Sequence, residues 1–174
     1  MAKIKIALIF LILLFSFWTA FLSGKSTGRY AVSIKIDPDE KYQVVSVLDG
    51  DTFEIKFDKG TRTVRMLGID TPETVDPRKP IQCFGKEASD MTKSLLSHHT
   101  VSLRVDKTQS QTDKFGRLLA YVYRDDDLFI NEYLLKNGFA REYTYSKAYS
   151  LQKQFKALQT EAKKEMVGLW KNCD

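Results

Sequence analysis

The chain has 174 residues, which is long enough for one domain with a well-buried core and excludes two large domains. Because 43% of its residues are hydrophobic and 28% are charged, one globular domain is expected. The formal net charge of +5 permits a polyanionic partner but does not establish one.

The N-terminal segment, residues 1–24, predicts contact with a membrane. Lys3 and Lys5 precede an uncharged apolar run from Ile6 to Leu22, which lies at the short limit for a spanning helix. Large side chains end the run and no Ala-x-Ala motif is present, so an uncleaved anchor is favoured, with a cleaved signal peptide as the alternative. Basic residues on its N-terminal side place the rest of the chain outside the cytoplasm.

Residues 25–40 contain Ser, Gly, Lys and Pro with little periodicity and predict a linker. A single domain then spans residues 41–174. Alternating apolar residues predict three strands at its start, Tyr42–Leu48, Thr52–Asp58 and Thr61–Leu67. In the third of these strands Val64 and Met66 share one face, so Arg65 points away from the apolar side.

The second part of the domain mixes helices with strands. Apolar residues at helical spacing predict helices at Lys86–Ser97, Asn131–Asn137 and Leu151–Met166. An alternating run predicts a strand at Thr100–Asp106, and a fifth strand is predicted at Leu118–Arg124. Five short strands with three helices predict an α+β domain built as a five-stranded oligonucleotide/oligosaccharide-binding (OB-fold) barrel.

Three acids and two arginines beside turns are the strongest candidates for chemistry. Asp51 and Asp70 each follow a strand, where two carboxylates can share a hard cation such as Ca²⁺ or Mg²⁺. Glu73 can take a proton from water, and the guanidinium groups of Arg65 and Arg117 match phosphate oxygens. Taken singly, these residues are equally typical of turns, caps and exposed salt bridges. Taken together, they favour phosphodiester hydrolysis.

The remaining residue types exclude other catalytic sites. His98 and His99 are the only histidines, and they are adjacent near a predicted helix end, which leaves little for a histidine-based nuclease or a Ser-His-Asp hydrolase. Cys83 and Cys173 are the only cysteines, so a structural zinc site is disfavoured. In an oxidising compartment this pair is expected to form a disulfide, with two unpaired thiols as the alternative.

Several ordered motifs of this chain resemble the staphylococcal nuclease (thermonuclease) family. The resemblance runs from about Tyr42 to Trp170. The motifs that carry it are Asp49-Gly50-Asp51-Thr52, Val64-Arg65-Met66-Leu67-Gly68-Ile69-Asp70-Thr71-Pro72-Glu73, Gly85-Lys86-Glu87-Ala88, Asp113-Lys114-Phe115-Gly116-Arg117-Leu118-Leu119-Ala120-Tyr121 and Gly168-Leu169-Trp170.

The resemblance implies a five-stranded barrel with three helices and Ca²⁺-dependent hydrolysis of DNA and RNA to products with 3′-phosphates. It implies that Asp51 and Asp70 bind Ca²⁺ through their carboxylates and Thr71 through its backbone carbonyl. It also implies that Glu73 acts as a general base or positions the water. These roles agree with those expected from the residue types alone.

The same resemblance assigns the positively charged and aromatic residues of the site. Arg65 and Arg117 would clamp the scissile phosphate and stabilise the charge that grows in the transition state. Tyr143 and Tyr145 would form a nucleotide-binding wall on which a base or sugar packs. Their alternative role is partial core packing between the last two helices. Phe115 stands where the family often has Tyr, which removes a hydroxyl that could touch a terminal phosphate.

The expected protein is therefore a monomeric Ca²⁺-dependent nuclease outside the cytoplasm, membrane-anchored or secreted after signal cleavage. Arg78 and Lys79 are candidate phosphate contacts only. The first alternative function is a catalytically silent nucleic-acid-binding module, but the acids and arginines that such a module is expected to lose are retained. The second is a barrel that binds an oligosaccharide or a protein.

Overall fold

The computed structural model describes residues 36–74 and 80–173. The predicted membrane segment at residues 1–24 and most of the predicted linker at 25–40 lie outside these residues. None of the helices within the two described ranges has the length and apolar character that a membrane span requires.

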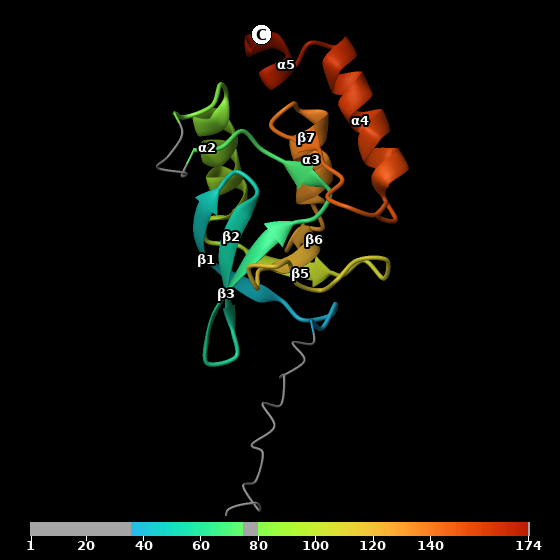
Figure 1. Ribbon diagram of the computed structural model, residues 1–174. Helices are drawn as coiled ribbons and strands as arrows, with labels where there is room; N and C mark the ends of the chain where they lie inside the picture. Colours follow the sequence, from blue (N-terminus) through green and yellow to red (C-terminus); the bar gives the residue numbers. More distant parts are fainter. Residues whose placement is uncertain (1–35, 75–79, 174) are drawn as a thin grey trace, which may run out of the picture. The chain divides into compact units, whose positions relative to one another are not determined.

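A closed five-stranded barrel forms the centre of the domain, as predicted (Figure 1). Its strands follow one another around the barrel in the order β1-β2-β3-β6-β5. Their bounds are β1 Tyr42–Asp49, β2 Thr52–Phe57, β3 Gly60–Met66, β5 Thr100–Arg104 and β6 Leu118–Arg124. Parallel pairing of β3 with β6 and antiparallel pairing of β1 with β5 close the barrel, which leaves no open edge among these strands.

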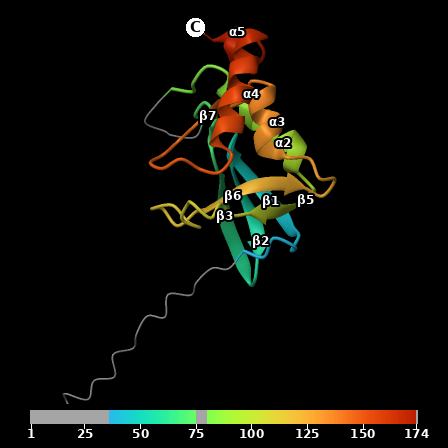
Figure 2. The same ribbon diagram turned by 90° about the vertical axis from the view of Figure 1, so that its right-hand side faces the viewer.

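Four helices occur within the described residues: α2 Gly85–Leu96, α3 Ile130–Lys136, α4 Gln152–Lys164 and α5 Leu169–Asn172. The prediction of three helices is confirmed by α2, α3 and α4, while the short α5 was not predicted. Figure 2 shows that the four helices lie toward one end of the barrel. The predicted bounds of α2, α3 and α4 differ from the observed ones by one or two residues at each end, as expected for frayed termini.

A small second sheet was also not predicted. It pairs β4 Ile69–Asp70 with β7 Arg141–Glu142, so that Asp70 lies opposite Arg141. Two-residue strands carry no hydrophobic alternation, and the sequence therefore gave no signal for them. This sheet is important for the site because it fixes the backbone of Asp70.

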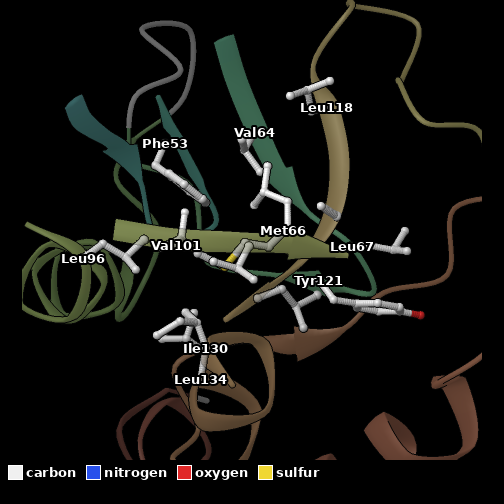
Figure 3. Packing of buried hydrophobic residues seen from close by; sticks show 14 of the residues in the cluster. Phe53, Val64, Met66, Leu67, Leu96, Val101, Leu118, Tyr121, Ile130 and Leu134 are labelled. Carbon is white, nitrogen blue, oxygen red and sulfur yellow. The ribbon is translucent and has the colours of Figure 1, made fainter. Parts of the chain in front are cut away.

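The core fills the barrel and continues beneath α3. Phe53 and Ile55 of β2 are fully buried, as their alternation with polar residues predicts. Figure 3 shows Ile130 and Leu134 of α3 lying close to Met66 of β3. This packing holds α3 against the end of the barrel from which the chain leaves β3 toward Asp70.

The predicted disulfide between Cys83 and Cys173 is present and joins the segment before α2 to the C-terminal end of α5. A loop closed across this separation of 90 residues restricts the unfolded chain, which is worth about 4 kcal/mol in the chain-entropy model. The covalent link also ties the C-terminus to the chain that follows the Asp70 turn.

Candidate active site

A cleft of about 710 Å³ lies at the mouth of the barrel and collects the predicted site residues. Its lining includes every residue assigned above to catalysis, metal binding or nucleotide binding: Asp51, Arg65, Asp70, Thr71, Glu73, Arg117, Tyr143 and Tyr145. These residues come from the turn between β1 and β2, from β3, from β4 and the turn after it, and from the segments before β6 and after β7. The fold therefore brings together side chains that are far apart in the sequence.

The turn between β1 and β2 positions Asp51. Thr92 of α2 donates from Oγ1 to the Gly50 carbonyl at 2.6 Å, which holds the turn against α2. A side chain at Gly50 would clash with Thr71, since a Cβ there would lie 2.6 Å from Thr71 Oγ1. Only glycine allows this close approach between the two turns. Asp51 itself is 5% exposed and accepts hydrogen bonds from Thr52 Oγ1 at 2.9 Å and the Thr71 N–H at 3.0 Å.

Arg65 joins the two predicted metal ligands. Its Nη2 lies 3.0 Å from Asp51 Oδ2 and 2.8 Å from Asp70 Oδ1. Its Nη1 donates to the carbonyls of Met66 at 2.9 Å and Ile69 at 2.7 Å. The side chain is 13% exposed, so the guanidinium group is nearly enclosed but keeps one side toward the cleft. The two carboxylates thus converge on a single positive group.

Several acids lie close to one another at this end of the cleft. Burial raises the pKa of Asp70; Arg65 opposes that rise, and the nearby charges of Asp51 and Glu73 add to it. Burial likewise raises the pKa of Asp49, and a hydrogen bond from Thr74 Oγ1 at 2.6 Å opposes the rise. We call Asp49, Asp51, Asp70 and Glu73 the acid cluster.

Asp49 does more than end β1 before the turn that carries Asp51. Its side chain is 7% exposed, lines the cleft and reaches Thr74, which lies beyond the Asp70 turn. It therefore links the end of β1 to the segment that carries Glu73. Arg78 and Lys79, the further candidate phosphate contacts, lie outside the described residues.

Arg117 lies on the loop before β6 and is held by its own turn. Its Nε donates to Asp113 Oδ2 at 2.7 Å, and its backbone N–H donates to Asp113 Oδ1 at 3.0 Å. Burial alone would raise the pKa of Asp113, but these hydrogen bonds and one from the Phe115 N–H outweigh it and lower the pKa. The Arg117 guanidinium also lies 5.5 Å from the centre of the Phe115 ring. The structure thus brings Arg117 into the cleft without an ion pair to Asp51 or Asp70.

Tyr143 and Tyr145 are 45% and 70% exposed and lie on the cleft lining, with ring centres 6.3 Å apart. This exposure argues against the alternative of core packing between the last two helices. Phe115, the departure from the family pattern, is also exposed and lines the same cleft. Three aromatic rings are therefore available to stack with a base or sugar.

The donor atoms fit Ca²⁺. Asp51 and Asp70 supply neighbouring carboxylate oxygens, which a hard cation prefers. Beside them, Thr71 Oγ1 is buried and has no hydrogen-bond partner among the described residues. Within the ranges that the structure covers, no group of three His, Cys, Asp or Glu residues has an arrangement that holds a metal ion. A Ca²⁺ site here therefore needs the Thr71 carbonyl and water to complete two carboxylates, which Ca²⁺ accepts.

Comparison with known proteins decides the family. A family model described as "Staphylococcal nuclease homologue" matches residues 63–172. The chain is 42% identical over 134 residues to a thermonuclease of Staphylococcus hyicus, an alignment that covers 77% of this chain and 78% of that protein. The chain belongs to the staphylococcal nuclease family. A thermonuclease of Staphylococcus intermedius is 41% identical over 131 residues, which cover 75% of this chain and 76% of that protein.

A further member of similar sequence is the endonuclease YncB of Bacillus subtilis. It is 40% identical over 124 residues, which cover 71% of this chain and 58% of that protein. The family resemblance inferred from the sequence motifs is thus confirmed, and the matched region contains the whole cleft from Arg65 onward.

One residue that supports the cleft was not singled out from the sequence. Asp106 follows β5, is 5% exposed and accepts hydrogen bonds from Tyr121 Oη and the Ser150 N–H, both at 2.6 Å. It also accepts from the Thr108 N–H at 2.8 Å and Oγ1 at 2.7 Å. The only local signal is an Asp two residues before a Thr, which is typical of a turn. Its long-range partners are visible only in the fold.

Proposed function

We propose that this protein is a Ca²⁺-dependent nuclease that hydrolyses phosphodiester bonds of DNA and RNA and leaves 3′-phosphates. The observation that carries the proposal is the contact of one Arg65 nitrogen with both Asp51 and Asp70 in a cleft that also holds Glu73 and Arg117. The names of the similar proteins, thermonuclease and endonuclease, support the same reaction class.

In the proposed reaction, the two arginines bind the phosphate. Arg65 and Arg117 both line the cleft, and guanidinium groups stay protonated at any working pH. Charge on the non-bridging oxygens increases as water attacks phosphorus, so both arginines bind the transition state more strongly than the ground state. Products with 3′-phosphates follow when the bond from phosphorus to the 5′-oxygen breaks.

Glu73 supplies the proton acceptor. Its side chain lines the cleft close enough to Asp49 and Asp70 to affect both of their pKa values. A carboxylate at this position can take a proton from the attacking water or orient that water toward phosphorus. Asp51, Asp70 and the Thr71 carbonyl would hold Ca²⁺, which when bound supplies Lewis-acid polarisation of a phosphate oxygen.

Substrate binding outside the metal site involves the aromatic residues. Tyr143 and Tyr145 offer exposed ring faces, and stacking on such faces tolerates any base. This supports activity on both DNA and RNA with little sequence preference. We further propose that a single copy of the chain is active, because every group named here comes from one chain.

We propose a location outside the cytoplasm, with the N-terminal segment as membrane anchor or as a cleaved signal. The Cys83–Cys173 disulfide supports an oxidising compartment, where such bonds persist. The mass of the protein extracted from its native membrane tests the anchor: the full-length mass is expected, and a mass reduced by the first 20 to 25 residues, roughly the length of a signal peptide, indicates cleavage.

The function is tested by assaying the purified full-length chain on single-stranded DNA, double-stranded DNA and RNA, each with Ca²⁺, Mg²⁺ or chelator. We expect cleavage of all three substrates with Ca²⁺ and its loss with chelator. End-labelled products should carry 3′-phosphates. Binding of nucleic acid without any Ca²⁺-dependent cleavage would instead favour the catalytically silent module.

A further inference from the structure

The segment between the acid cluster and α2 pairs directly with the backbone of Glu73. The Glu73 N–H donates to Gln82 Oε1 at 3.0 Å, and the Gln82 N–H donates to the Glu73 carbonyl at 3.1 Å. Both polar backbone groups of the proposed base are therefore held by one residue, which lies nine positions later in the chain. Gln82 does not itself line the cleft.

Gly85 also lies close to the backbone of Glu73. A Cβ at Gly85 would lie 3.2 Å from the Glu73 carbonyl oxygen and 3.1 Å from that of Pro72. The first residue of α2 thus packs tightly against the Glu73 turn, and the Gly85 N–H donates to the Gln82 carbonyl at 3.0 Å. Together these contacts fix the backbone of Glu73 relative to α2.

Gln82 is exposed, and an exposed hydrogen bond that water can replace stabilises little by itself. The position of Gln82 must therefore be fixed by the contacts of the residues next to it. Next to it, Cys83 is covalently bonded to Cys173, and Phe84 stacks on Phe139 with ring centres 5.6 Å apart. Two anchors directly beside Gln82 therefore restrict its position.

The other end of the disulfide is also firmly attached. In α5, Leu169 is buried and its N–H donates to the Gly138 carbonyl at 2.8 Å. Trp170 lies over the Arg141 guanidinium at 5.4 Å, and Arg141 pairs with Asp70 between β7 and β4. The C-terminal helix therefore contacts β7 of the small sheet and, through Cys83, is joined to the segment that pairs with Glu73.

We propose that Gln82, held by the Cys83–Cys173 disulfide, is a positioning residue for Glu73 and sets the rate of the chemical step. This inference rests on the proposed nuclease function, in which Glu73 acts on the attacking water. A general base must lie within hydrogen-bond reach of that water, so a displacement of its backbone lowers turnover more than it weakens substrate binding.

Gln82→Ala tests this inference, with Gln154→Ala as the matched control, because Gln154 is an exposed glutamine on α4 that contacts Glu132. We expect Gln82→Ala to lower kcat about tenfold on single-stranded DNA with saturating Ca²⁺, while KM changes less than about twofold. Gln82→Glu keeps the acceptor oxygen and should restore most of kcat. An unchanged kcat in Gln82→Ala, or a loss that appears only in KM, would overturn the proposal.

The role of the disulfide is tested by Cys83→Ser combined with Cys173→Ser. This variant should also lower kcat. Gln82→Ala should then reduce kcat by a smaller factor in the double cysteine variant than in the native chain, because both changes release the same segment. Fully multiplicative losses would show that the disulfide does not act through Gln82.

Hydrogen exchange at the Glu73 amide gives a readout that does not need activity. Protection of this amide should fall in Gln82→Ala and in the double cysteine variant, and stay unchanged in Gln154→Ala. If the native chain shows no Ca²⁺-dependent cleavage, the proposed function fails, while the exchange measurement still decides whether Gln82 holds Glu73. Equal protection in all variants would contradict the proposal.

Discussion

Asp51 and Asp106 are equally buried, at 5% exposure, yet their surroundings differ. Asp106 accepts hydrogen bonds from Tyr121, Thr108 and Ser150, all of which are neutral donors. Asp51 shares the single guanidinium of Arg65 with Asp70, and further acids lie close by. Asp51 also accepts from Thr52 Oγ1 and the Thr71 N–H, so the difference lies in the shared guanidinium and the neighbouring acids.

The pKa directions follow from this difference. Burial alone would raise the pKa of Asp106, but the hydrogen bonds from Tyr121, Thr108 and Ser150 outweigh it and hold the pKa well below the ordinary 3.8. In the acid cluster, burial raises the pKa of Asp70, and Arg65 does not cancel the rise. A carboxylate with many donors stabilises the fold, whereas a crowded set of acids gains from an added cation.

The largest expected effect is that of Glu73→Gln. This change keeps the shape of the side chain but removes the proton acceptor, so kcat should fall about 1,000-fold with little change in thermal stability. The rate of cleavage of polymeric DNA with Ca²⁺ measures it. Glu165→Gln, on the exposed end of α4, is the matched control and should be as active as the native chain. Full activity of Glu73→Gln would remove Glu73 from the mechanism.

A smaller loss is expected for Arg65→Lys. Lysine keeps the charge but cannot contact Asp51, Asp70 and a phosphate with a planar fork, so kcat should fall about 100-fold. Arg62→Lys on the same strand, where the side chain is exposed, should have no effect. Equal activity of the two variants would show that the Arg65 fork is not used.

Asp106→Asn tests whether the hydrogen-bonded carboxylate of Asp106 stabilises the fold. Because the folded-state pKa of Asp106 is lowered, its contribution to stability is present above the ordinary pKa of 3.8 and is lost as pH falls through the folded value. Asp106→Asn should therefore lower the free energy of unfolding at neutral pH by about 2 kcal/mol and flatten its acid dependence. Urea unfolding between about pH 7 and pH 2 measures both. If the free energy of unfolding of Asp106→Asn falls with acid as steeply as that of the native chain, the Asp106 carboxylate does not stabilise the fold as proposed.

The smallest effects are expected at the segment that connects the two regions. The Tyr143 N–H donates to the Gly68 carbonyl at 3.0 Å, and the segment ends at Ser150, which donates to Asp106. Replacing Tyr143 or Tyr145 by Ala should raise KM about fivefold to tenfold by removing one stacking surface, with kcat nearly unchanged. Steady-state kinetics on single-stranded DNA separates the two constants. A fall in kcat with constant KM would mean that the rings position the reacting groups instead.

Much of the fold could be predicted because the barrel strands are short runs rich in apolar and β-branched residues between turns. Leu118–Arg124 was predicted at its observed bounds, and the other barrel strands to within two residues. The helix predicted at Leu151–Met166 ends at Lys164, and Met166 is exposed with a positive φ of 52°. Met166 lies at helical spacing from the apolar residues of α4, so the pattern extends two residues past the observed helix end. Periodicity alone does not define where a helix ends.

The site was predicted where local sequence determines geometry. Acids and arginines beside turns signalled a cleft, and the structure brings these residues together. The role of Asp106 depends on Ser150, 44 residues away, and that of Gln82 on its pairing with Glu73. These partners come together only in the folded chain, so the local sequence around each residue does not predict them.

We propose that Asp51 and Asp70 form a Ca²⁺ site, whereas Asp106, although equally buried, supports the fold. Calorimetric titration of the full-length chain with Ca²⁺ tests it most directly, alongside Asp51→Asn combined with Asp70→Asn, and Asp106→Asn. We expect one Ca²⁺ to be bound by the native chain and by Asp106→Asn, and none by the double variant. Ca²⁺ binding that survives in the double variant, or is absent from the native chain, would contradict it.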